Sequence, residues 1–202
     1  MFASQDFYET QDEFANPKMS EYINTTGLPS TTQVLSPWID TRWFTAESRE
    51  RGSAVHQALA EYLGGKPGFM VALPPEWQGY FDSGRRWIDD HVTEVLLIET
   101  RISDIQWRFC GQPDLICKMA DGYTALIDWK TGPPADWHRL QIAGYRHLAK
   151  PTHPTQRGMT IHLDAAGGAP KVEEHAHNYE ADLNRLLGAV SLWWFFNPGG
   201  GT

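Results

Sequence analysis

The spacing of apolar residues changes from a helical to a strand period near residue 92 and returns to a helical period near residue 135. Apolar side chains recur every three or four residues over residues 74–91, which predicts an amphipathic helix. Three segments with strand patterns follow at residues 93–102, 106–119 and 123–130. Helices on both sides of three strand segments favour an α/β (α+β) fold, in which a small mixed β-sheet is flanked by helices.

Further elements are expected before and after these strands. Ser30 and Gln33 have the spacing of a capping box, which predicts a short helix from residue 31. The segment Ala120-Asp121-Gly122 is typical of the tight turn of a hairpin. The remaining expected elements are helices at residues 45–63, 135–150 and 180–196 and short strands at residues 159–163 and 171–175.

The length of 202 residues is usual for one domain. Residues 1–27 lack sustained periodicity, so we expect them to form a partly ordered extension before a single domain at residues 28–202. No apolar run approaches the length that spans a membrane, and the acidic first residues do not resemble a secretory signal. These features predict a cytoplasmic protein without a membrane partner.

Composition limits the partners and cofactors. The chain has 17 Lys and Arg residues against 25 Asp and Glu residues, and its net charge of −8 means that nucleic acid would have to bind through a local basic groove. Cys110 and Cys117, the two cysteines, cannot form a four-cysteine zinc or iron–sulfur site. On one strand they would be roughly 23 Å apart, so we interpret both as packing residues. No G-x-x-x-x-G-K-[ST] phosphate loop occurs, so no nucleotide cofactor is expected.

Asp128 and Lys130 are the first residues that suggest a functional site. Side chains alternate between the two faces of a strand, so both are expected on the face that Leu126 occupies. Burial of such a pair adds little stability, because the loss of solvation can cancel the ionic attraction. The pair therefore favours a functional site, and the alternative is an exposed ion pair at the edge of the sheet.

Asp114 supplies a second carboxylate. Gly111-Gln112-Pro113-Asp114 interrupts the preceding strand segment, and a bend there would direct Asp114 toward Asp128. Carboxylate oxygens suit Mg²⁺ or Mn²⁺, and Mg²⁺ commonly uses one or two of them together with water and substrate phosphate. Lys130 would then orient the attacking water or hold the charge of the phosphate.

Five segments occur in an order that is familiar from one group of enzymes. They are RGSAVH at residues 51–56, Glu99, GQPD at residues 111–114, IDWKTG at residues 127–132 and QIAGY at residues 141–145. With the lead-in LPSTTQVL at residues 28–35, they resemble the PD-(D/E)XK nuclease superfamily, in particular its RecB-like and phage exonuclease-like branch. The resemblance covers roughly residues 28–150 and implies a restriction-endonuclease-like core.

The resemblance implies a role for several residues. Asp114 and Asp128 correspond to metal ligands, and Lys130 corresponds to the catalytic lysine. His56 would be an additional ligand, and the main-chain carbonyl of Trp129 would complete the set that the protein provides. An imidazole ligand shifts the preference from Mg²⁺ toward Mn²⁺.

Other residues match the family at less central positions. Glu99 corresponds to an acid on the first strand, with Glu94 as a neighbouring alternative. Gln141 and Tyr145 match a Q-x-x-x-Y element that would position the DNA strand and the lysine. They share a helix face at i and i+4, and His138 lies one turn earlier on that face. The alternative for His138 is a residue of a half-buried helix with no role in the site.

The resemblance implies a metal-dependent DNA nuclease that uses Mg²⁺ or Mn²⁺ to hydrolyse phosphodiester bonds. An exonuclease that acts on DNA ends or single strands is favoured, with a role in recombination, repair or phage DNA processing in a bacterial or phage-infected cell. Two alternatives stay open: a non-catalytic nucleic-acid-binding or scaffold protein on the same fold, and a structure-selective or restriction-like endonuclease. The iron–sulfur cluster of CRISPR-adaptation nucleases is excluded, because the chain has only two cysteines. The oligomeric state is not predicted.

Overall fold

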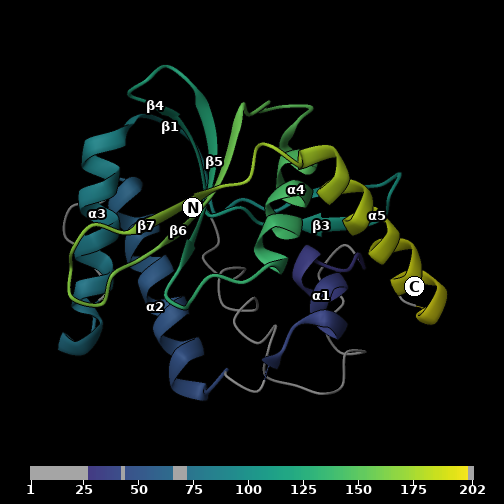
Figure 1. Cartoon of the computed structure of the whole chain (residues 1–202), viewed down its shortest axis with the longest axis horizontal. Helices are drawn as coiled ribbons and strands as arrows, with labels where there is room; N and C mark the ends of the chain where they lie inside the picture. Colours follow the sequence, from purple (N-terminus) through teal and green to yellow (C-terminus); the bar gives the residue numbers. More distant parts are fainter. Residues whose placement is uncertain (1–26, 42–43, 66–71, 200–202) are drawn as a thin grey trace, which may run out of the picture.

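The computed structural model describes residues 27–41, 44–65 and 72–199, so the expected N-terminal extension lies outside the described residues except for Gly27. Five strands form one sheet in the order β1-β4-β5-β6-β7 (Figure 1). Strands β5 and β6 run parallel and every other neighbouring pair is antiparallel, so the sheet is mixed. The strands are β1 (Val92–Ile98), β4 (Leu115–Met119), β5 (Thr124–Lys130), β6 (Arg157–His162) and β7 (Lys171–Glu174).

Helices cover both faces of this sheet, which confirms the expected α/β fold class (Figure 1). The alternation of side chains along β5 divides the core in two. Ile127 and Trp129 pack with α2 and α3 on one face, whereas Leu126 packs with α1, α4 and α5 on the other. The helices are α1 (Thr31–Leu35), α2 (Ala46–Leu63), α3 (Gln78–His91), α4 (Trp137–Ala149) and α5 (Tyr179–Phe196).

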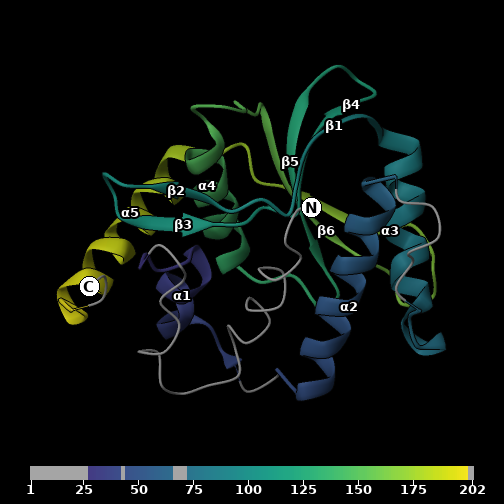
Figure 2. The ribbon, with the colours of Figure 1, turned by 180° about the vertical axis from the view of Figure 1, so that it is seen from behind.

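The expected strand segments at residues 93–102 and 106–119 are wrong as continuous strands, because each is divided between two sheets. The outer parts, β2 (Ile102–Asp104) and β3 (Phe109–Gly111), pair with each other in a separate two-stranded sheet (Figure 2). The breaks lie side by side, since the main-chain N–H of Glu99 donates to the carbonyl of Asp114 at 3.1 Å. Local chain geometry explains both, because Glu99 has a φ of 41° and Pro113 has no N–H to donate.

The division also separates the two cysteines. Cys110 lies in β3 and Cys117 lies in β4, so they do not share a strand. Both are buried and neither forms a disulfide, which confirms that they are packing residues.

The capping box and the hairpin turn that the sequence predicts at the ends of secondary-structure elements are both present. The Ser30 hydroxyl accepts the main-chain N–H of Gln33 at 3.1 Å, and the Gln33 side chain accepts that of Ser30 at 2.8 Å, so the expected capping box is confirmed. Single 3-10 turns follow α1 (η2, Ser36–Trp38) and precede α3 (η4, Pro75–Trp77). Gly122, with a φ of 88°, forms the tight turn between β4 and β5.

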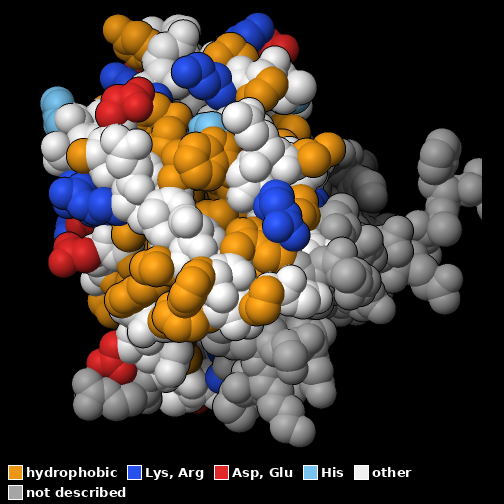
Figure 3. Space-filling model, turned by 90° about the vertical axis from the view of Figure 1, so that its right-hand side faces the viewer, with side chains coloured by type: hydrophobic (Ala, Val, Ile, Leu, Met, Phe, Trp, Pro, Cys, Tyr) orange, Lys and Arg blue, Asp and Glu red, His pale blue; other side chains and the backbone are white. Residues whose placement is uncertain are grey.

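The end of α5 exposes several large apolar side chains, on the side of the molecule seen in Figure 3. They are Leu192, Phe195 and Phe196. Next to them the Trp194 indole donates to the main-chain oxygen of Arg108 at 2.8 Å, and the Arg108 guanidinium covers its ring. These contacts attach the turn between β2 and β3 to α5. Within the described ranges, we find no helix whose length and apolar character would let it cross a membrane.

The close packing of α3 against the loop after β6 at Gly79 leads to a testable prediction. A Cβ at Gly79 would lie 1.8 Å from the main-chain oxygen of Ala165, a contact that no side-chain rotation relieves. We expect Gly79→Ala to lower the free energy of unfolding by about 2 kcal/mol or more. Gly188→Ala is the matched control, because Gly188 is an exposed position of α5 with no atom within 4 Å of a Cβ.

In a helix interior, alanine in place of glycine raises the free energy of unfolding by about 0.5–1 kcal/mol. The control variant Gly188→Ala should therefore be slightly more stable than the unchanged protein. Urea denaturation of the two variants measures both effects. If Gly79→Ala were as stable as Gly188→Ala, the close approach of α3 to this loop would be contradicted.

Candidate active site

Three side chains of the types that can bind a metal ion meet where α2, β1 and β4 come together. His56 comes from α2, Glu99 follows β1, and Asp114 precedes β4. One ligand atom from each residue lies within 4.8 Å of the other two. Ligands around one octahedral Mg²⁺ or Mn²⁺ lie about 3 to 4 Å apart, given metal–oxygen distances near 2.1 Å. Small side-chain movements would therefore bring all three onto one ion.

Asp114 is fixed from two directions. One of its oxygens accepts the main-chain N–H of Trp129 at 2.6 Å, and the other lies 3.2 Å from Nδ1 of His56. The bend expected at Gly111–Asp114 thus turns the carboxylate toward β5. Before this bend, the absence of a side chain at Gly111 lets Tyr145 of α4 pack closely, since a Cβ there would lie 2.6 Å from its ring. The Trp129 side chain is buried, and the role of its carbonyl as a metal ligand stays a prediction.

Of the two neighbouring glutamates, the structure brings Glu99 to Asp114. Gln112 holds Glu99 in place by donating from Nε2 to its carboxylate at 2.8 Å. Glu94 instead is exposed and pairs with Lys118 at 2.5 Å. The positive φ of Glu99 is uncommon outside glycine, and such backbone conformations concentrate at functional sites.

Asp128 and Lys130 lie on one face of β5, as the strand period predicts, and form an ion pair at 2.5 Å. Their side chains are 4% and 15% exposed, so the pair is buried and not an edge contact. Asp128 is not among the three grouped donors, because its carboxylate faces Lys130. It is still close enough for the Asp114 carboxylate to add to the effect of burial and raise the pKa of Asp128.

The cluster holds more negative charge than its surroundings neutralise. Burial opposes a charged His56, but the carboxylates of Asp114, Glu99 and Asp128 raise its pKa to about 9. Burial, with the neighbouring Asp114, raises the pKa of Glu99 to about 8. Burial also opposes ionisation of Asp114, but His56 and Lys130 hold its pKa below the usual range. The raised pKa values of His56 and Glu99 thus share one cause, the buried carboxylates around them.

Lys130 is connected to α4, which packs on the face of the sheet that Leu126, Asp128 and Lys130 share. Its ammonium donates to Oε1 of Gln141 at 2.9 Å. Nε2 of Gln141 donates to the Tyr145 hydroxyl at 3.0 Å and to Oγ1 of Thr32 at 3.3 Å. Gln141 and Tyr145 are buried, so this chain of hydrogen bonds holds the Lys130 ammonium from the side of α4. Thr32 could not be predicted from the sequence, because a hydroxyl in the lead-in helix gives no signal of a partner 109 residues away.

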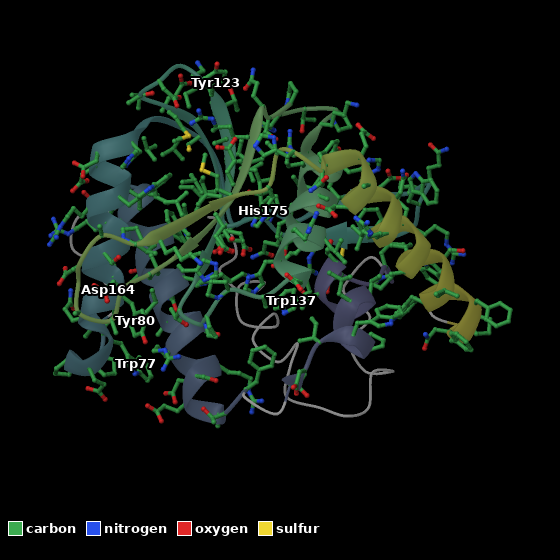
Figure 4. The ribbon with its side chains drawn as sticks, in the orientation of Figure 1. Trp77, Tyr80, Tyr123, Trp137, Asp164 and His175 are labelled. Atoms are coloured by element: carbon green, nitrogen blue, oxygen red, sulfur yellow. The ribbon has the colours of Figure 1, made fainter. Side chains whose placement is uncertain are left out.

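His138 lies on α4 without joining this chain of bonds. It is buried, and its Nδ1 accepts the main-chain N–H of Ala135 at 3.3 Å. Its ring centre is 5.5 Å from that of His162. Trp137, labelled in Figure 4, precedes it at the start of α4, and the Lys130 ammonium lies 5.3 Å from the Trp137 ring centre. These contacts agree with the alternative of a structural histidine.

His138 predicts a pH dependence of stability. Burial, together with Lys130 and two neighbouring histidines, lowers its pKa to about 2. An unfolded chain protonates this imidazole below about pH 6.5, whereas the folded chain keeps it neutral. The unfolded state therefore binds one more proton at lower pH, and the free energy of unfolding decreases as the pH falls.

We expect His138→Asn to lessen this decrease, because its amide oxygen can still accept the Ala135 N–H. From about pH 7.5 to about pH 5 the unchanged protein should lose about 2 kcal/mol more than the variant. Urea denaturation with chelator present, at both pH values, measures the difference. Equal losses would contradict a neutral, buried His138.

Comparison with known proteins leaves the chain without an assigned family. No model of a protein family matches it. No curated protein sequence matches it either. Among solved structures, a protein of Eubacterium rectale that is described provisionally as an exonuclease matches at 12% identity, over 95% of this chain and 87% of that one. The TM-score is 0.45, and a likeness of this extent carries no argument about function.

Proposed function

We propose that this protein is a divalent-metal-dependent nuclease that hydrolyses phosphodiester bonds of DNA, with exonuclease action on ends or single strands. The observation that supports it best is the grouping of His56, Glu99 and Asp114 beside the buried pair of Asp128 and Lys130. Buried charges of this number are costly unless they serve a ligand, since apolar replacements are often as stable. Their order along the chain is also that of the PD-(D/E)XK motifs.

Each residue of the cluster has a distinct part in the proposal. His56, Glu99 and Asp114 would hold the ion, and Asp128, which lies near Asp114 and is predicted from the resemblance as a ligand, would join them. When bound, the ion supplies a Lewis acid for the phosphate and lowers the pKa of water. Lys130 donates from its ammonium to the attacking water or to the phosphate oxygen on which negative charge develops.

Arg51 adds positive charge at the same place. Its guanidinium donates to the main-chain oxygen of Thr131 at 3.4 Å, one residue after Lys130. It also lies over the ring of Tyr80, labelled in Figure 4, at 5.1 Å from the ring centre. Because the net charge of the chain is −8, DNA contacts would be confined to this vicinity, and binding should weaken steeply with added salt.

The proposal predicts metal-dependent shortening of linear DNA. End-labelled linear DNA and closed circular DNA are incubated with the protein in Mg²⁺, in Mn²⁺ and in chelator. We expect the linear substrate to be degraded from its ends in either metal, the circle to survive, and the chelator to stop the reaction. Cleavage of the circle would contradict exonuclease action and favour the endonuclease alternative. Binding without cleavage in both metals would contradict the enzyme.

A matched pair of lysines supplies the control for this assay. Lys130 and Lys118 both contact a carboxylate at 2.5 Å, but the Lys118 side chain is 52% exposed on β4, away from the cluster. We expect Lys130→Gln to lower the cleavage rate by about 10²–10³-fold and Lys118→Gln to leave it unchanged. Glutamine can still donate to Asp128, and circular dichroism verifies that the variant folds. Equal rates for both variants would overturn the role of Lys130.

A further inference from the structure

A cavity of about 540 Å³ lies outside the candidate active site, between the start of α4, strand β7 and the start of α5. Its lining combines imidazoles with carboxylates: Asp136, Glu173, Glu174, His175 and His177. Figure 4 labels His175, which lies between the sheet and the helices α4 and α5. Arg139 also lines the cavity, but its charge is paired with Asp182 at 2.8 Å. The lining therefore favours a cation over an anion.

His162, on the neighbouring strand β6, has one ring nitrogen in an unusual situation. Its side chain is 6% exposed, and Nε2 has no hydrogen-bond partner among the described residues. Nε2 faces the carboxylate of Glu173 at 3.6 Å. The other nitrogen, Nδ1, lies 3.0 Å from the main-chain oxygen of Gly132. A carbonyl only accepts, so Nδ1 carries a proton, and the lone pair with which this ring can bind a metal is therefore that of Nε2, on the side of Glu173.

This arrangement is typical of a histidine that binds a metal. Such a histidine donates its second ring N–H to a carbonyl or carboxylate, which fixes the tautomer and the direction of the free lone pair. For His162 the carbonyl of Gly132 has this part, two residues after Lys130. A cation at Nε2 would therefore also fix the segment that follows the proposed catalytic lysine.

His175 offers a second imidazole on the same face of the sheet. In the antiparallel pairing of β6 and β7, Glu173 lies opposite Thr160, and the period of two places His175 on the face of Glu173. Nε2 of His175 contacts the hydroxyl of Thr160 at 2.9 Å. His175 and Glu173 thus line the cavity from β7 and the residue after it, and His162 on β6 lies behind Glu173.

We propose that His162, His175 and Glu173 bind a second divalent cation of the zinc class, with an open coordination position toward the cavity. Two imidazoles and one carboxylate are a common ligand set for Zn²⁺, whereas Mg²⁺ prefers oxygen ligands. Among the described residues, three donors lie within 4.8 Å of one another only at His56, so His175 has to turn from Thr160 to bind. The proposal does not depend on nuclease activity.

The test measures metal binding with the first site disabled. Metal-stripped protein with His56→Gln and Asp114→Asn is titrated with Zn²⁺ by calorimetry and with Cu²⁺ by electron paramagnetic resonance. We expect one Zn²⁺ per chain and nitrogen hyperfine splitting from two imidazoles. If the double variant does not fold, the unaltered chain titrated with Zn²⁺ in excess Mg²⁺ replaces it and should show the same single zinc site.

Two further substitutions assign the ligands. His162→Asn keeps a donor for the Gly132 carbonyl but removes the lone pair, and Glu173→Gln removes the charge at a partly exposed side chain. We expect zinc affinity to fall by about 100-fold and at least about 10-fold, respectively. His153→Asn is the control, because His153 contacts Thr152 in the loop after α4, and it should leave the affinity unchanged.

Absence of zinc binding in the background with the first site disabled would overturn the proposal. Unchanged affinity in both His162→Asn and Glu173→Gln would also overturn it, because the zinc would then be bound elsewhere. If the DNA cleavage assay fails, the interpretation of these zinc-binding results does not change, because this test measures metal binding alone.

Discussion

The rest of the site depends on the two contacts of the Asp114 carboxylate. It accepts the main-chain N–H of Trp129 at the end of β5 and lies against Nδ1 of His56 on α2. One side chain thereby ties the break before β4 to the adjacent strand and to a helix that is distant in sequence. The buried N–H of Trp129 would be left without this partner if Asp114 were apolar, at a cost of about 1–3 kcal/mol. The same bond holds the carboxylate in the position where it meets Glu99.

Placing these carboxylates together has an electrostatic consequence that the surrounding structure accommodates. Glu99, Asp114 and Asp128 lie in a buried region, and the positive charges close to them belong to Lys130 and His56. The raised pKa values of Glu99 and His56 express this imbalance, since both retain protons that water would remove from an isolated glutamate or histidine. The divalent cation proposed for this site would relieve the same repulsion, so its binding would stabilise the folded region.

Local and periodic features could be predicted from the sequence. The capping box at Ser30, the helix ends and the shared face of Asp128 and Lys130 depend on spacing within one element, and the structure has all of them. The resemblance to nuclease motifs also predicted His56 and Asp114 as site residues, and Nδ1 of His56 lies 3.2 Å from Oδ1 of Asp114.

Features that depend on pairing between distant segments could not be predicted. The division of two strand segments between two sheets follows from the left-handed backbone of Glu99 and from pairing of β2 with β3, neither of which alternation reveals. For the same reason the choice between Glu94 and Glu99 needed the structure. His162 and Glu173 meet only through the register of β6 and β7, so spacing along the chain does not reveal their contact.

The central claim is that His56, Glu99 and Asp114 hold one divalent cation. Crystals soaked in Mn²⁺ and measured at the manganese absorption edge test it directly, because the anomalous signal locates the ion without reference to activity. The account predicts a peak at about 2.2 Å from a ring nitrogen of His56 and from oxygens of Glu99 and Asp114. Saturating Mn²⁺ that gives no peak between these three side chains would contradict it.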